Sequence, residues 1–274
     1  MYYKTIGELL EYNRKKNNIS QSLLCKGICS NATYYRYEQD LTIPSKYTLN
    51  YLLERLGLNP NTINYLCTKS DVIALSLQNS INNSIDNSSY AYELIEKYQK
   101  NRSLKNINLH QQYILKMKGV LAEKQCQTIA AINYYREALC CTKKSTQIDL
   151  DSLYSVTEFF LILRLILIRN DYESLFKIYE FILSLPDIHI LKITYKGEIV
   201  EELTKSSTIS DEFKIQAINS VISYKKRIHQ LNNIDVLINR KSMFLSLEEN
   251  EKELLNYTDI IQELKDLLRN DRLQ

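Results

Sequence analysis

Apolar residues recur every three or four positions along most of this chain, which is the spacing of one buried helix face. In the first 66 residues this spacing marks four short segments, from Ile6, Leu9 and Leu10 to a leucine-rich run that ends at Gly57. Serines stand directly before the two middle segments, where a hydroxyl can cap a helix N-terminus. The pattern predicts helices over about 6–15, 21–25, 31–38 and 46–56.

The two middle segments are joined by a short turn that contains Gly27, and this arrangement is typical of a helix-turn-helix. The third helix is then the recognition helix, because the major groove admits a helix and shows a distinct pattern for each base pair. Its period turns Tyr34 and Tyr37 inward. Arg36 could bond guanine or phosphate, Asn31 could pair with adenine, and the start of the second helix would meet phosphate. We expect these residues to contact DNA: Gln21, Ser22, Ser30, Asn31, Thr33, Tyr35 and Arg36.

The charge of the chain is concentrated in this first part. Residues 1–66 carry eight basic and five acidic side chains, and this excess equals the net charge of the whole chain, +3. An excess of basic residues is the sign expected of a segment that meets phosphate.

The remainder, residues 67–274, has the pattern of helical hairpins at intervals of roughly 40 residues. Residues 112–145 match the tetratricopeptide pattern best, with Gly119 in the first helix and Tyr135 in the second. Residues 159–186 match more loosely, and amphipathicity alone suggests hairpins over 70–104, 187–230 and 231–270. With only 5 Gly and 3 Pro, tight β-turns are scarce. We therefore predict an all-α fold: a helix-turn-helix bundle over 1–66, followed by a superhelix of tetratricopeptide-like hairpins over 67–274.

A single hairpin cannot bury its apolar face, so such hairpins stack into a superhelix whose concave groove suits a peptide. Asn side chains can both donate to and accept from a peptide backbone. Arg164 interrupts an apolar run, so it should face water, an internal carboxylate such as Glu158, or an anionic ligand group such as a peptide's terminal carboxylate. The repeat register directs these residues into the groove: Asn79, Asn83, Tyr113, Lys116, Thr157, Phe160 and Arg164.

A family resemblance rests on Ser20-Gln21, Leu24-Cys25, Gly27-Ile28-Cys29-Ser30, Thr33-Tyr34, Arg36, Glu38 and Pro44-Ser45. Over about 50 residues this pattern resembles the XRE (Cro/CI) helix-turn-helix, and the Gly-Ile-Cys-Ser step is similar to that of the peptide-responsive Rgg/PlcR/PrgX (RRNPP) regulators of Gram-positive bacteria. Gln39-Asp40 depart from the Asn-Gly often found there. The resemblance implies a DNA-binding head, a repeat domain that captures a short signalling peptide, and dimerisation. We expect a homodimer on double-stranded DNA, at an inverted-repeat operator with half-sites about 34–36 Å apart or a multiple of this.

Other functional classes find little support. The three histidines are far apart, the six cysteines lack metal-site spacing, and no glycine-rich phosphate loop is present, so we expect no metal, no cofactor and no enzyme activity. The chain begins without an export signal and its most apolar run is too short to cross a membrane. We expect a cytoplasmic protein with no membrane partner and with reduced cysteines in its core. Two alternatives remain: a phage or mobile-element repressor whose repeats are a protein-interaction and oligomerisation scaffold, or a repeat scaffold without a DNA role.

Overall fold

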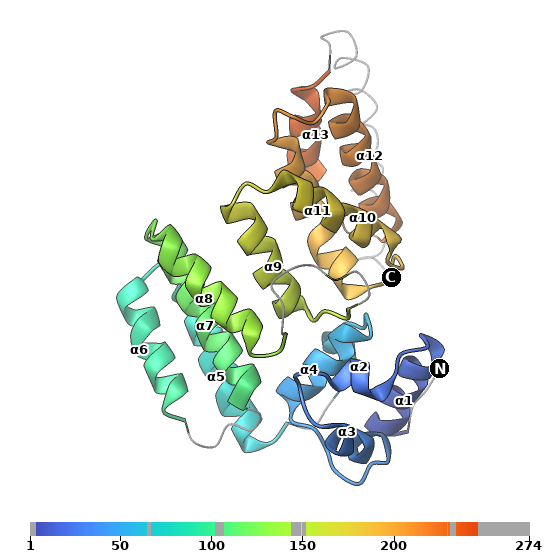
Figure 1. Ribbon diagram of the computed structural model, residues 1–274, viewed down its shortest axis with the longest axis vertical. Helices are drawn as coiled ribbons and strands as arrows, with labels where there is room; N and C mark the ends of the chain where they lie inside the picture. Colours follow the sequence, from blue (N-terminus) through green and yellow to red (C-terminus); the bar gives the residue numbers. More distant parts are fainter. Residues whose placement is uncertain are drawn as a thin grey trace, which may run out of the picture. The chain divides into compact units, whose positions relative to one another are not determined.

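The computed structural model describes residues 4–64, 67–101, 107–143, 149, 152–228, 230 and 234–245. All regular structure in these residues is helical, which confirms the predicted fold class. In chain order the helices are α1 Ile6–Lys16, α2 Gln21–Cys25, α3 Asn31–Glu38, α4 Lys46–Arg55, the 3-10 turn η1 Pro60–Thr62, α5 Lys69–Asn83, α6 Ser88–Gln99, α7 Ile107–Lys124, α8 Thr128–Cys140, α9 Val156–Ile168, α10 Tyr172–Ser184, α11 Ile190–Thr204, α12 Asp211–Arg227 and α13 Ile234–Ser242 (Figure 1).

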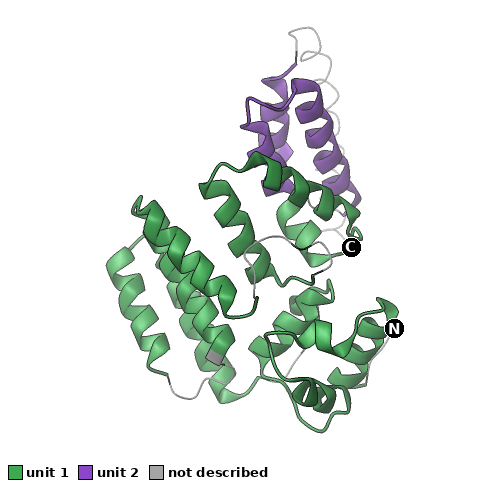
Figure 2. Ribbon diagram, viewed as in Figure 1, with its two compact units in different colours: residues 1–196 green, residues 197–274 purple. Residues whose placement is uncertain are grey.

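The chain divides into two compact units, residues 1–196 and residues 197–274 (Figure 2). The first unit contains α1 to α10 and the start of α11, and the second contains the end of α11 with α12 and α13. The division predicted from the sequence, at residues 66 and 67, follows motifs rather than compactness and stays a prediction.

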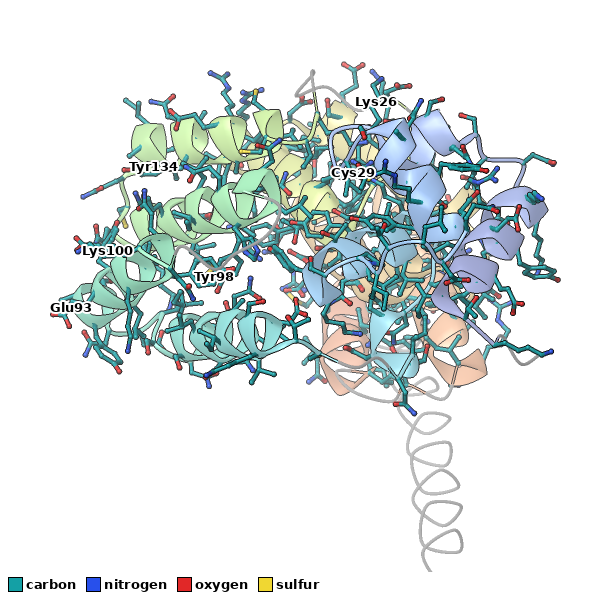
Figure 3. All side chains as sticks on the ribbon, turned by 90° about the horizontal axis from the view of Figure 1, so that it is seen from below. Lys26, Cys29, Glu93, Tyr98, Lys100 and Tyr134 are labelled. Atoms are coloured by element: carbon teal, nitrogen blue, oxygen red, sulfur yellow. The ribbon has the colours of Figure 1, made fainter. Side chains whose placement is uncertain are left out.

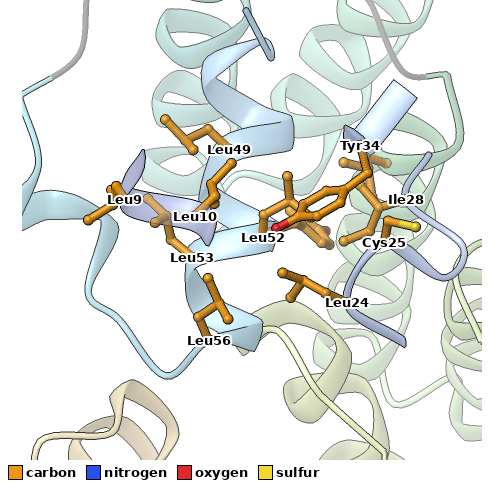
Figure 4. Packing of buried hydrophobic residues seen from close by; sticks show 12 residues of the cluster. Leu9, Leu10, Leu24, Cys25, Ile28, Tyr34, Leu49, Leu52, Leu53 and Leu56 are labelled. Atoms are coloured by element: carbon orange, nitrogen blue, oxygen red, sulfur yellow. The ribbon is translucent and has the colours of Figure 1, made fainter. Parts of the chain in front are cut away.

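Helices α1 to α4 form a small bundle, called the head below (residues 4–64), around a leucine-rich core. Leu10, Leu24, Tyr34 and Leu52 are fully buried there, and Figure 4 shows their side chains gathered between the helices. A hydroxyl-bearing N-cap residue begins each helix: Thr5, Ser20, Ser30 and Ser45 each accept a hydrogen bond from a backbone N–H of the first turn. The four predicted helices and the two predicted serine caps are confirmed.

Helices α5 and α6, α7 and α8, and α9 and α10 pack as successive pairs, as the repeat pattern predicts over 70–104, 112–145 and 159–186. Helices α11 and α12 lie within the range predicted for a further hairpin, 187–230. The α7–α8 hairpin shows why the pattern needs a glycine. A Cβ added at Gly119 would collide with the ring of Tyr135, which is fully buried between the two helices. The absent side chain thus lets α7 and α8 approach closely. For the hairpin predicted over 231–270, only α13 lies within the described residues.

The expectation of six core cysteines is wrong for half of them. Cys25 is buried and Cys29 and Cys141 are half-buried, but Cys67, Cys126 and Cys140 are exposed. All six are free thiols. Among the described residues, no group of three His, Cys, Asp or Glu side chains is placed to hold a metal ion. None of the described helices is both long and apolar enough to span a lipid bilayer.

Candidate DNA-binding face and candidate peptide site

Helix α3, the predicted recognition helix, presents a polar outer face. Its inner side is fixed by Tyr34, which is buried, and by Tyr37, which is half-buried. Asn31 and Arg36 are exposed, and Tyr35 leaves 51% of its surface to solvent. The predicted division of α3 into an inner and an outer face is confirmed.

The turn between α2 and α3 depends on Gly27, whose φ of +75° lies in the left-handed region. The cap of α3 is Ser30, which accepts from Thr33 N at 3.1 Å and lies 2.9 Å from the Thr33 hydroxyl. Ser22 is exposed at the start of α2. Predicted DNA-contact residues from both helices are therefore open to solvent.

Two of the predicted contacts also serve the internal structure of the head. The Gln21 side chain is half-buried and donates to Glu38 at 2.6 Å. The Asn31 side-chain oxygen accepts from the thiol of Cys25 at 2.9 Å. These bonds hold both residues in a fixed orientation at the start of their helices.

A buried ion pair joins α1 to the inner side of α3. Arg14 of α1 binds Glu38 through two nitrogens, at 2.6 and 2.9 Å, and reaches the Ile19 carbonyl at 3.0 Å. Burial alone would raise the pKa of Glu38, but the hydrogen bonds from Arg14 and Gln21 lower it below its ordinary value. Glu38 therefore stays charged at neutral pH, and α1, α2 and α3 are joined through one carboxylate.

A cavity of about 500 Å³ opens beside the recognition helix. Its walls come from the turn before α3, from α3 itself, from the loop that follows it and from the start of α4, and they include Cys29, Ser30 and Arg36. Ile43, in the loop after α3, also lines this cavity and is 75% exposed to solvent.

Helix α4 joins the head to the hairpins behind it. Its Tyr51 hydroxyl donates to Gln112 of α7 at 2.8 Å, and Gln112 in turn donates to the Thr142 hydroxyl at 2.8 Å. One turn later Arg55 binds Glu158 of α9 through two nitrogens, at 2.5 and 3.2 Å. The head is thereby anchored by polar bonds on α7 and α9.

The structure brings three of the predicted peptide-contact residues together. The Lys116 ammonium of α7 lies 5.3 Å from the ring centre of Tyr113 and 5.6 Å from that of Phe160 on α9, in cation–π contact with both. Burial lowers the pKa of Lys116, and the nearby carboxylate of Glu54 acts in the opposite direction. Thr157 lies on the same helix as Phe160, about one turn earlier.

The other predicted peptide-contact residues have different surroundings. Asn79 and Asn83 are exposed on α5. Tyr113 is buried, and its hydroxyl is engaged with the Gln78 carbonyl and the Asn82 side chain at 3.1 Å each. Arg164 is half-buried and forms its ion pair with Glu123 of α7. Glu158, the carboxylate suggested from the sequence, binds Arg55 instead.

No protein-family model matches the sequence, and no curated protein matches it. Among solved structures, it is similar to the crystal structure of Bacillus thuringiensis PlcR in complex with the peptide PapR7 and DNA, with a TM-score of 0.50. The two chains are 14% identical, and the match covers 97% of this chain and 96% of PlcR.

This chain shares the fold of PlcR. PlcR has a helix-turn-helix followed by tetratricopeptide-like helices, so the likeness confirms the predicted fold class, and it agrees with the resemblance to the Rgg/PlcR/PrgX group that the sequence suggested. The match extends over both the head and the hairpins, whereas the resemblance in sequence covers only about 50 residues of the head.

Sequence reasoning missed the partners of these residues. It named Glu38 only as part of a motif and did not pair it with Arg14, although two opposite charges in a small bundle were a usable signal. It did not name Glu123 as the partner of Arg164, or Glu54 as the carboxylate beside Lys116. These partners come from distant segments that no local pattern connects.

Proposed function

We propose that this chain is a sequence-specific DNA-binding transcriptional regulator rather than an enzyme, and that its hairpins bind a short signalling peptide that controls the head. The observation that carries the proposal is the recognition helix, which is capped by Ser30 and turns Asn31, Tyr35 and Arg36 to solvent. Major-groove readers use the first residues of such a helix. The excess of basic over acidic side chains in residues 1–66 gives the head a net positive charge, which attracts phosphate.

On DNA, the roles of the exposed residues follow from their chemistry. The Arg36 guanidinium suits the two acceptors of guanine or a phosphate, and the Asn31 amide suits the acceptor and donor of adenine. Ser22 and Gln21 lie at the N-terminus of α2, where backbone N–H groups favour a phosphate. Ser30, Thr33 and Tyr35 complete the proposed face. We propose that two copies bind an inverted repeat, as a homodimer in the cytoplasm.

The proposed peptide site lies on the first helices of the α7–α8 and α9–α10 hairpins. Lys116, between Tyr113 and Phe160, offers a positive charge flanked by aromatic surface, which suits an acidic group of a peptide. Arg164 offers a second cation, at present paired with Glu123. Asn79 and Asn83 of α5 would bond the peptide backbone. Support comes from PlcR, which has the same fold and whose crystal structure contains the peptide PapR7 as well as DNA.

A short path connects this site with the head. On α9, Thr157 and Phe160 flank Glu158, and Glu158 holds Arg55 of α4. A peptide that contacts Thr157 and Phe160 therefore touches the same helical turn that anchors the head. For such binding to shift DNA affinity, the peptide must bind one arrangement of the head more tightly than another.

The experiment that tests the DNA role is selection from a random duplex library with the full-length chain. We expect enrichment of an inverted repeat, and affinity for the selected duplex that falls steeply with salt. A library that stays random after repeated rounds would overturn the proposal.

The peptide role needs a separate test. Short synthetic peptides encoded beside the gene are screened by thermal unfolding, and a ligand at about 100 times its Kd should add roughly 2.7 kcal/mol of stability. For a peptide that stabilises the chain, Arg164→Ala should weaken binding in calorimetry. Specific DNA binding without any stabilising peptide would favour the alternative of a repressor with a protein-interaction scaffold.

A further inference from the structure

The turn of the helix-turn-helix brings two cysteines close together. Cys25 ends α2 and Cys29 follows one turn later, with the Cys29 N–H donating to the Cys25 carbonyl at 3.1 Å. The two thiols are close enough for each to shift the pKa of the other. Residues joined by such a turn lie within the range of Cα separations that a disulfide spans, roughly 4.4 to 6.8 Å.

The surroundings of this pair favour a thiolate. Arg55 donates to the carbonyls on both sides of Cys25, to Leu24 at 2.9 Å and to Lys26 at 2.7 Å. The hydrogen bond from Cys29 lowers the pKa of Cys25 to about 7; burial opposes this shift, and the charge of Arg55 adds to it. The same hydrogen bond, together with burial, raises the pKa of Cys29. The two sulfurs thus share one proton near neutral pH.

A small oxidant can reach the pair. Cys25 is buried, but Cys29 lines the cavity of about 500 Å³ beside the recognition helix. Figure 3 shows Cys29 at the same end of the head as the exposed Lys26. Peroxide is small enough to enter a cavity of this size.

We propose that Cys25 and Cys29 form an oxidation site, at which a peroxide converts the two thiols into an intrachain disulfide that weakens the DNA-binding face. The Cys29 sulfur attacks one peroxide oxygen while its proton passes to the Cys25 thiolate, and the O–O bond breaks. The departing hydroxide takes that proton and leaves as water, which gives a sulfenic acid at Cys29. The Cys25 thiolate then attacks the Cys29 sulfur and the S–O bond breaks. The second hydroxide takes a proton from solvent, so one peroxide gains two electrons and yields two waters.

The disulfide changes the start of the recognition helix directly. When Cys25 holds the shared proton, its thiol donates to the Asn31 side chain at 2.9 Å. A disulfide has no S–H, so this bond is lost and Asn31 is no longer held. The turn is also tightly packed, because a Cβ at Gly27 would collide with the backbone of Thr142. The new S–S bond must therefore be accommodated by movement of the α2–α3 turn or of Asn31.

Peptide mapping tests the modification without any DNA. The reduced full-length chain is treated with one equivalent of hydrogen peroxide, blocked with iodoacetamide and digested with trypsin without reductant. Trypsin cleaves after Lys16, Lys26 and Arg36, so a Cys25–Cys29 bond joins peptides 17–26 and 27–36 into one species that reductant separates. We expect this species from the native chain and from Cys126→Ser, an exposed control, and not from Cys29→Ser. Separate alkylated peptides 17–26 and 27–36, in a sample whose exposed cysteines are oxidised, would overturn the proposal.

A second measurement tests the effect on DNA. The affinity of the oxidised chain for a duplex selected as above should fall about tenfold, the size of one good base contact, and dithiothreitol should restore it. Cys29→Ser, with its helical circular dichroism intact, should bind equally well before and after peroxide. Linked peptides together with unchanged affinity would overturn the regulatory half of the proposal. If no duplex binds the reduced chain, the DNA role itself fails, and the peptide map still decides the oxidation site.

Discussion

Arg55 and Glu158 lie 103 residues apart in the chain and form a two-point ion pair that solvent barely reaches, with side-chain exposures of 1% and 0%. Burying two charges has a large desolvation cost, which good geometry and further hydrogen bonds offset. Arg55 also binds two carbonyls of the head, and Glu158 also accepts from Ser155 N at 2.8 Å. This pair couples the head to α9.

Arg55→Met should destabilise the chain by about 3 to 5 kcal/mol, because it leaves the Glu158 carboxylate buried without its partner. Adding Glu158→Gln removes that charge and retains an acceptor for Ser155, so the double variant should recover part of the loss. Urea unfolding of the two single variants and the double variant measures the coupling. If the losses of the two single variants simply add in the double variant, the two side chains do not act as a pair.

Glu54 should make the free energy of unfolding depend on pH in the opposite sense from most carboxyl groups. Burial raises the pKa of Glu54 to about 7, so the folded chain holds a proton that the unfolded chain releases near pH 4.5. The free energy of unfolding should therefore fall between about pH 4.5 and 7, by up to about 3 kcal/mol. Glu54→Gln keeps an acceptor for Val156 N and should remove this slope in urea titrations at pH 5 and 7.5. If the pH dependence persists in Glu54→Gln, another titrating group is responsible for it.

Glu158 should act in a lower pH window. Burial alone would raise its pKa, but the charges of Arg55 and Lys143 and the hydrogen bonds lower it to about 2. Its contribution to stability is present above about pH 4.5 and is lost as the pH falls toward 2. Acid unfolding followed by circular dichroism should show this loss in the native chain. The loss should be smaller in Glu158→Gln, which has no proton to take up at that position.

Two glycines in helices give a matched pair of substitutions. Gly119→Ala should destabilise the chain by about 1 to 3 kcal/mol, because its Cβ meets the buried ring of Tyr135. At Gly197 the nearest atoms to an added Cβ are 3.8 Å away, so Gly197→Ala should be neutral or stabilise by up to about 1 kcal/mol. Thermal unfolding compares the two. Similar effects at both positions would contradict the close packing of α7 and α8.

Arg36→Ala should abolish selective retardation of the selected duplex while the chain stays folded, because it removes the guanidinium from the recognition helix. Arg136→Ala is the control, since Arg136 is also an exposed arginine but lies on α8. Gel retardation with competitor DNA measures selectivity, and circular dichroism confirms the fold. Unchanged selectivity in Arg36→Ala would remove α3 from its proposed role.

Local patterns in the sequence predicted most of the head and the hairpins. Helix period and serine caps depend on neighbours within a few residues, and this is why Ser20, Ser30 and the limits of α2 and α3 agree with the structure. The same reasoning put Cys126 in the core. It lies instead in the tight turn before α8, with a φ of +57°, where an apolar neighbourhood does not ensure burial.

Pairings between distant segments could not be predicted. Arg164 required a partner because it interrupts an apolar helix, but nothing in the sequence distinguished Glu123 from Glu158. That choice depends on the angle at which α7 and α9 meet, and periodicity does not encode this angle. Whether the predicted DNA and peptide residues contact those ligands stays a prediction.

The hydrogen bonds that α4 and the residues just after it make with the later helices limit which segments of this chain can be exchanged with those of another protein. Tyr51 donates to Gln112, and Arg55 donates to Glu158. The Gly57 carbonyl, just after α4, accepts from Ile190 N at 2.9 Å. A head transplanted onto foreign hairpins would lose the acceptors Gln112 and Glu158 and the donor Ile190 N at once. Chimeric regulators built from this scaffold should therefore exchange only the outward residues of α2 and α3, and retain α4 with the positions that receive it.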